Sequence, residues 1–87
     1  MAMQGKNRET EVKLKPQKPA KVVRALKNLG FIYLEKRGSH HILTSNKTND
    51  RIVIPDYGET IPAFIIRKVL KGAGVTVDEF LKALADS

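Results

Sequence analysis

"FIYLEKRGSHHILTSNKTNDRIVIP", residues 31–55, holds three short apolar runs separated by turn residues. The runs are rich in β-branched, aliphatic and aromatic side chains, which are typical of β-strands. They cover residues 31–36, 40–45 and 51–55. Gly38 lies between the first two runs, and "NKTND" (46–50), between the second and third, has the composition of a turn. Because runs this close are most simply joined as two hairpins, the stretch predicts a three-stranded antiparallel sheet.

The residues on either side of this stretch have helical spacing. Apolar side chains recur every three or four residues over about residues 19–29, which begin with a proline and are followed by a glycine. A second helix is predicted after Pro62, ending at Gly72 and Gly74, and "TVDE" (76–79) is a capping box that opens a third. Helices against one face of the sheet give an α+β fold, α-β-β-β-α with a short additional C-terminal helix.

The composition indicates one small domain. The chain has 87 residues, of which 41% are hydrophobic, so it is long enough for a single packed core and too short for two. It contains no cysteine, which suits a reducing compartment. No apolar run approaches the roughly 20 residues that cross a bilayer, and the first residues lack the apolar centre of a signal peptide. We therefore expect a cytoplasmic protein without membrane contact.

The charge indicates an anionic partner. The net charge is +7, which favours nucleic acid or an acidic protein. Residues 1–18 carry five basic and two acidic side chains, and therefore three of the seven net charges. Because residues 1–17 show little apolar periodicity, we interpret them as a basic flexible N-terminal tail, followed by a single domain over residues 18–87.

Two adjacent histidines, His40 and His41, open the second predicted strand. Neighbouring side chains of a strand point to opposite faces, so the two rings do not form one site. A lone imidazole transfers protons near neutral pH, and RNA carries its own nucleophile, the 2′-hydroxyl. Lys36 and Arg37, just upstream, are candidates to offset charge on the phosphate, and Gly38 allows close approach of a ligand. An exposed polar hairpin without catalysis is the alternative.

Other chemistries fit this region less well. A metal site would need ligands from Glu35, Asp50 or Asp56, and their spacing to the histidines does not match a zinc site. We predict no metal and no other cofactor. Ser39 precedes His40, but no nucleophile elbow surrounds it, so a serine hydrolase is not indicated.

Several surface features are compatible with RNA binding. Tyr57, in the predicted loop 56–62, is a candidate for stacking on a base, whereas Tyr33 is as easily a core residue. The basic faces of the first two helices could follow phosphates, although solvated helix faces are the commoner explanation. A sheet face that no helix covers would be a surface for a partner.

Three segments together resemble the HicA (YcfA-like) mRNA interferase family of toxins. They are "KPAKVVRALKNLGFIYLEKRGSHHILTS" (18–45), "RIVIP" (51–55) and "IRKVLKGAGVTVDEFL" (66–81). The resemblance implies a double-stranded-RNA-binding-domain-like fold and a toxin domain over residues 18–87. It also implies metal-independent cleavage of mRNA, and inhibition by a HicB-type antitoxin that covers the active site.

The resemblance also implies roles for single residues. The histidine directly after Gly-Ser is the family's catalytic one, which here is His40, presented by Gly38 and Ser39. His41 falls where the family tolerates other residues and is interpreted as a bystander. Many members carry a histidine two residues after the proline that closes the third strand, and this chain has Tyr57 there.

Further departures from the family pattern are Phe64 and Ile65, where members often have Gly-Thr. The leading hypothesis is a ribonuclease toxin with His40 as general acid/base, and with Lys36, Arg37, Ser39 and Tyr57 binding RNA or stabilising phosphate. The alternatives are a non-catalytic RNA-binding module of the same fold and a protein-interaction domain. The sequence leaves the oligomeric state open.

Overall fold

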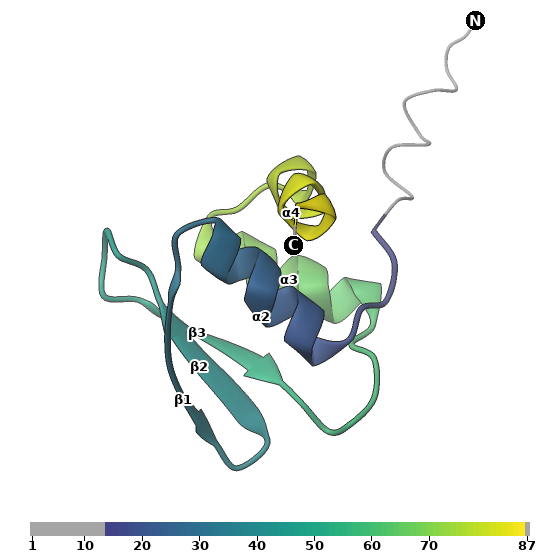
Figure 1. Cartoon of the computed structure of the whole chain (residues 1–87), viewed down its shortest axis with the longest axis horizontal. Helices are drawn as coiled ribbons and strands as arrows, with labels where there is room; N and C mark the ends of the chain where they lie inside the picture. The colour runs from purple at the N-terminus through teal and green to yellow at the C-terminus, as the bar shows by residue number, and fades with distance from the viewer. Residues whose placement is uncertain (1–13, 87) are drawn as a thin grey trace, which may run out of the picture.

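The computed structural model describes residues 14–86 and confirms the predicted α+β architecture (Figure 1). Three helices and a three-stranded sheet follow one another in the predicted order. The elements are α2 (Pro19–Asn28), β1 (Ile32–Arg37), β2 (His40–Thr44), β3 (Arg51–Pro55), α3 (Ala63–Ala73) and α4 (Val77–Ala85).

The sheet has the strand order β1-β2-β3 with both pairs antiparallel, so β2 is the central strand. A register shift between Tyr33 and Glu35 interrupts the pairing of β1 with β2. In Figure 1, α2 and α3 lie over the same face of the sheet, and α4 packs on the far side of α2. The other sheet face carries no helix among residues 14–86.

The core lies between the sheet and the helices because alternate strand residues point inward. Leu43, Ile52 and Ile54 are buried, whereas Ile32 and Val53 on the opposite face stay 48% and 44% exposed. The helices contribute the apolar stripe that their spacing predicts. Their most deeply buried large side chains are Val22, Leu26, Ile66, Leu70 and Phe80.

The helix ends follow the sequence signals, with one exception. The capping box of α4 is confirmed, with the Glu79 amide donating to the Thr76 hydroxyl over 3.1 Å and the Thr76 amide donating to the Glu79 carboxylate over 2.9 Å. Gly74 ends α3 in the left-handed conformation, with φ 75°. The prediction that Gly72 also ends this helix is wrong, because it lies inside α3. One following residue with positive φ is enough to stop a helix.

Residues 14–17 pack against the domain, although the sequence places them in the tail. Leu14 is buried in the core. Gln17 pairs with Ile61 through two backbone hydrogen bonds of 3.2 and 2.7 Å. These bonds tie the loop between β3 and α3 to the segment that precedes α2. The rest of the proposed tail, residues 1–13, lies outside the described residues. Among residues 14–86, no helix is long and apolar enough to span a membrane.

Candidate active site

The β1–β2 hairpin brings the candidate residues to one end of the sheet. Arg37 pairs with His40, so Gly38 and Ser39 form a two-residue connection. Gly38 has φ 61°, a conformation that such tight hairpin turns require and that glycine adopts without strain. The turn therefore fixes His40 as the first residue of the central strand.

The two histidines lie on opposite faces of the sheet. His40 pairs with Arg37 and Pro55, and His41 pairs with Lys36 and Ile54. Paired residues of antiparallel strands share a face. His41 is therefore on the side of buried Ile54, and His40 is on the open side. The same alternation separates Lys36 from Arg37, so the sequence neighbours belong to different clusters.

The ring of His40 contacts Tyr57. The phenol oxygen of Tyr57 lies 3.2 Å from Nε2 of His40. The two rings meet edge to face, with centroids 5.8 Å apart and an angle of 84° between their planes. Tyr57 itself is 68% exposed. Sequence reasoning considered this side chain for base stacking and missed its contact with His40. Its place two residues after Pro55, already noted as a departure from the pattern of the resembled family, was the available signal.

The ring of His41 is hydrogen-bonded at both nitrogens. Nε2 lies 2.7 Å from Oδ2 of Asp56, and Nδ1 lies 2.9 Å from the hydroxyl of Tyr33. The Nζ atom of Lys36 lies 3.7 Å from the same Asp56 oxygen. The hydrogen bond from His41 lowers the pKa of the Asp56 carboxyl below its ordinary value, and the Gly58 amide and Lys36 act in the same direction. Sequence reasoning missed this partner because 15 residues separate it from His41.

The remaining predicted residues surround this end of the sheet. The guanidinium of Arg37 donates to the Glu35 carboxylate over 2.8 Å and is 76% exposed, so it projects into solvent beside His40. The carbonyl of Ser39 accepts a hydrogen bond of 2.7 Å from the Asp56 amide. Arg37, Ser39 and Tyr57 therefore lie around His40, whereas Lys36 belongs to the cluster around His41.

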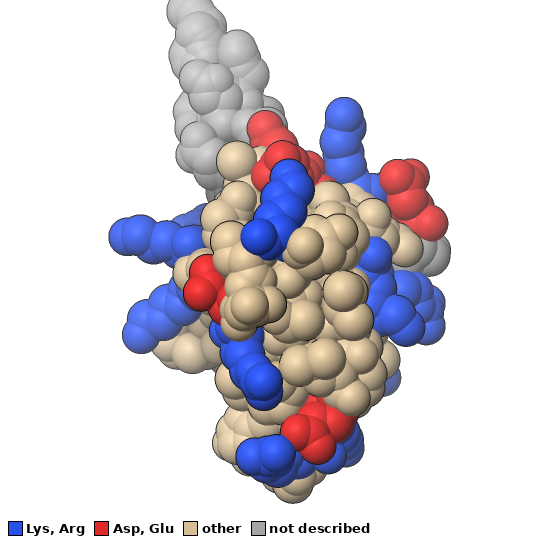
Figure 2. Space-filling model, turned by 90° about the vertical axis from the view of Figure 1, so that its left-hand side faces the viewer, with Lys and Arg blue, Asp and Glu red and all other residues tan. Residues whose placement is uncertain are grey.

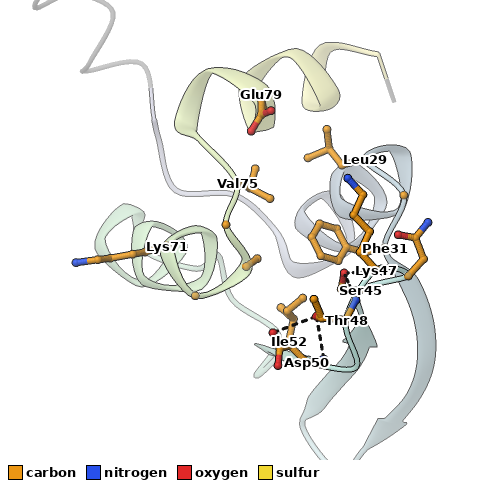
Figure 3. Close-up of a pocket in the computed structure, with 15 residues that line it drawn as sticks. Leu29, Phe31, Ser45, Lys47, Thr48, Asp50, Ile52, Lys71, Val75 and Glu79 are labelled. Carbon is orange, nitrogen blue, oxygen red and sulfur yellow. Dashed lines mark hydrogen bonds between the residues drawn. The ribbon is translucent and has the colours of Figure 1, made fainter.

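A separate cavity of about 450 Å³ lies at the opposite end of the sheet. There the β2–β3 turn meets the C-terminal ends of α2 and α3 (Figure 3). Leu29, Phe31, Ile52 and Val75 line it with apolar surface, and the Lys71 side chain points away from it. None of the candidate residues at the hairpin lines this cavity.

The positive charge is not gathered at the hairpin alone. Figure 2 shows lysine and arginine side chains spread over one face of the molecule, with uncharged surface between them. Within residues 14–86, no group of three or more His, Cys, Asp or Glu side chains could hold a metal ion. What distinguishes the hairpin is that its two histidines have different partners. Tyr57 contacts His40, whereas Asp56 and Tyr33 contact His41.

The chain also matches a known protein family. Residues 19–75 match the family described as HicA toxin of bacterial toxin-antitoxin, and this range contains α2, the three strands with both histidines, and the whole of α3. A search of curated proteins finds no match.

Proposed function

The chain belongs to the HicA toxin family of bacterial toxin–antitoxin systems, and on this premise we propose that it is an endoribonuclease that cleaves mRNA without a metal ion. His40 is the general acid/base and acts on the 2′-hydroxyl that attacks the neighbouring phosphate. The observation that carries the proposal is the placement of His40 on the open sheet face, beside the Tyr57 hydroxyl at 3.2 Å.

The residues around His40 suit a phosphodiester substrate. Arg37, solvated beside His40, supplies positive charge to the phosphate as negative charge builds on its oxygens. Gly38 and Ser39 form the turn that presents His40, and the Tyr57 ring, largely exposed, is available to an RNA base. Lys36 adds positive charge at the same end of the sheet from the opposite face. The reaction takes place in the cytoplasm, where mRNA is found.

The family membership implies an antitoxin partner. We assign a HicB-type antitoxin to the open face of the sheet, where it would cover His40. Ile32 and Val53, about half exposed on this face, support the assignment because a protein partner would bury them. Inhibition then follows from blocked access to the imidazole.

The test is the His40→Ala variant, with Thr44→Ala as its matched control. Thr44 lies on the same face of β2 at the other end of the strand. We expect His40→Ala to keep its fold and its antitoxin binding but to lose RNA cleavage and growth inhibition. Thr44→Ala should keep its fold, antitoxin binding, RNA cleavage and growth inhibition. Unchanged cleavage in His40→Ala would reject the assignment. RNA binding without cleavage in the wild type would support a non-catalytic RNA-binding module instead.

A further inference from the structure

His41 is placed where it cannot serve a substrate directly. Its side chain is only 15% exposed, and both ring nitrogens are occupied, by Asp56 and Tyr33. A carboxylate accepts hydrogen bonds and does not donate them, so Nε2 of His41 is the donor to Asp56. In the neutral ring, Nδ1 is then the acceptor for the Tyr33 hydroxyl. The role of this ring is therefore structural, and it acts through the hydrogen bond to Asp56.

Asp56 is held from three directions at the point where β3 ends. Its amide donates to the Ser39 carbonyl over 2.7 Å, and its Oδ2 accepts from His41. Its Oδ1 accepts from the Gly58 amide over 3.2 Å. The residues directly before and after Tyr57 are therefore both fixed by this one carboxylate. Gly58 has φ 87°, which lets the chain close this tight turn.

Apart from its contact with His40, the Tyr57 side chain is largely surrounded by solvent. Its side chain is 68% exposed, and the contact with His40 is made by the hydroxyl and ring at the far end of the residue. A solvated side chain changes rotamer readily, so the Tyr57 hydroxyl can return to His40 only if the Tyr57 backbone stays in place. The position of the Tyr57 hydroxyl against His40 therefore depends on the anchored backbone of residues 56–58.

We propose that His41 and Asp56 are a positioning pair, which holds Tyr57 against His40 from the opposite face of the sheet. The inference rests on the proposed function, because it assigns the second histidine to the alignment of the first. It also gives a role to Asp56, which makes no hydrogen bond with His40 but directly precedes Tyr57 in the chain.

The primary test is nuclear magnetic resonance on the intact protein, because it needs no RNA. In the wild type we expect cross-relaxation between the Tyr57 and His40 rings. Asp56→Ala should abolish it and shift the ring resonances of His40, while the amide resonances of Leu26 and Phe80, buried in the helices, stay in place. His41→Ala should give the same changes. Asp50→Ala is the matched control. It deletes a carboxylate that lies in the β2–β3 turn, at the other end of the sheet, and should leave the His40 ring unaffected.

A second variant keeps the proposal testable if Asp56→Ala does not fold. Asp56→Asn retains the side-chain shape and an oxygen for the Gly58 amide, but loses the charge-assisted bond with His41. We expect the same changes at His40 with smaller amplitude. Tyr57–His40 cross-relaxation of wild-type intensity in a folded Asp56 variant would overturn the positioning role.

Cleavage kinetics separate this proposal from the proposed function. If the protein cleaves RNA, Asp56→Ala should lower kcat by roughly three- to tenfold, the value of one hydrogen bond, with KM changed by less than about twofold. Adding Tyr57→Phe to Asp56→Ala should lower kcat no further, because both changes remove the same contact. Absence of cleavage in the wild type would reject the ribonuclease and leave the resonance result to decide the positioning role.

Discussion

The Tyr57 hydroxyl lies 3.2 Å from Nε2 of His40, across the gap between the loop after β3 and the first residue of β2. This contact gives the candidate catalytic imidazole a partner that is neither a carboxylate nor a backbone group. A hydroxyl can donate to or accept from a ring nitrogen, so Tyr57 can select the tautomer of His40 in either direction.

The first prediction separates the hydroxyl of Tyr57 from its ring. Tyr57→Phe keeps a ring for base stacking and removes the contact with His40, so we expect cleavage to fall roughly three- to tenfold with little change in RNA affinity. Tyr57→Ala should also weaken RNA binding, because it removes the stacking surface. Steady-state cleavage and a titration with a non-cleavable RNA measure the two effects. Equal kinetics for Tyr57→Phe and the wild type would exclude a role for the hydroxyl.

The second prediction concerns stability at low pH. The pKa of Asp56 in the folded protein lies below its ordinary value of 3.8, chiefly because of the hydrogen bond from His41. The unfolded chain therefore binds its proton first, and the stabilisation by this carboxylate is complete above about pH 3.8 and lost as the pH falls through the lower folded value. The difference in unfolding free energy between the wild type and Asp56→Asn should shrink over that range. Urea unfolding at several pH values measures it.

Glu79 is a second carboxylate with a lowered pKa and tests whether the stability loss at Asp56 is local. Its pKa is also lowered, first by the hydrogen bond from the Thr76 amide, at the start of α4. Because the two carboxylates share no partner, the losses from Asp56→Asn and Glu79→Gln should add in the double variant. A clearly non-additive result would show that the hairpin and α4 are coupled.

The third prediction is a pair of glycine substitutions with opposite signs. Gly38 has φ 61° and open space where a Cβ atom would lie, so Gly38→Ala should cost about 1–2 kcal/mol from backbone strain alone. Gly72 lies inside α3, also with open space, so Gly72→Ala should stabilise by roughly 0.5–1 kcal/mol. Chemical denaturation gives both values. Gly38→Asn should cost less than Gly38→Ala, because asparagine tolerates the left-handed region better.

The fourth prediction tests the additional helix. Phe80 is fully buried where α4 packs on α2, so Phe80→Ala should destabilise the domain by about 3–5 kcal/mol. Thr76→Ala, which removes only the cap of the same helix, should cost about 1 kcal/mol. If Phe80→Ala cost no more than Thr76→Ala, α4 would not be part of the cooperative core. Urea unfolding of both variants decides this.

Local patterns in the sequence are sufficient to predict most of the fold. The β-branched run in "RIVIP", the helical spacing after Pro19 and the capping box at Thr76 are each encoded within a few residues, and each is confirmed. Alternation along β2 also predicts that His40 and His41 point apart, because it depends only on strand geometry. Gly72 misleads as a signal for the end of α3 because glycine can stand inside a helix at modest cost.

The tertiary structure alone decides which groups the two histidines meet. Asp56 and Tyr57 follow β3, and their positions beside His41 and His40 depend on the antiparallel register that pairs β2 with β3. A register shift of one residue would exchange the faces, and no local pattern of residues 56 and 57 specifies it. The sequence therefore determined that one histidine faces solvent and one faces the helices, and the register of the sheet decided that a phenol meets the first and a carboxylate the second.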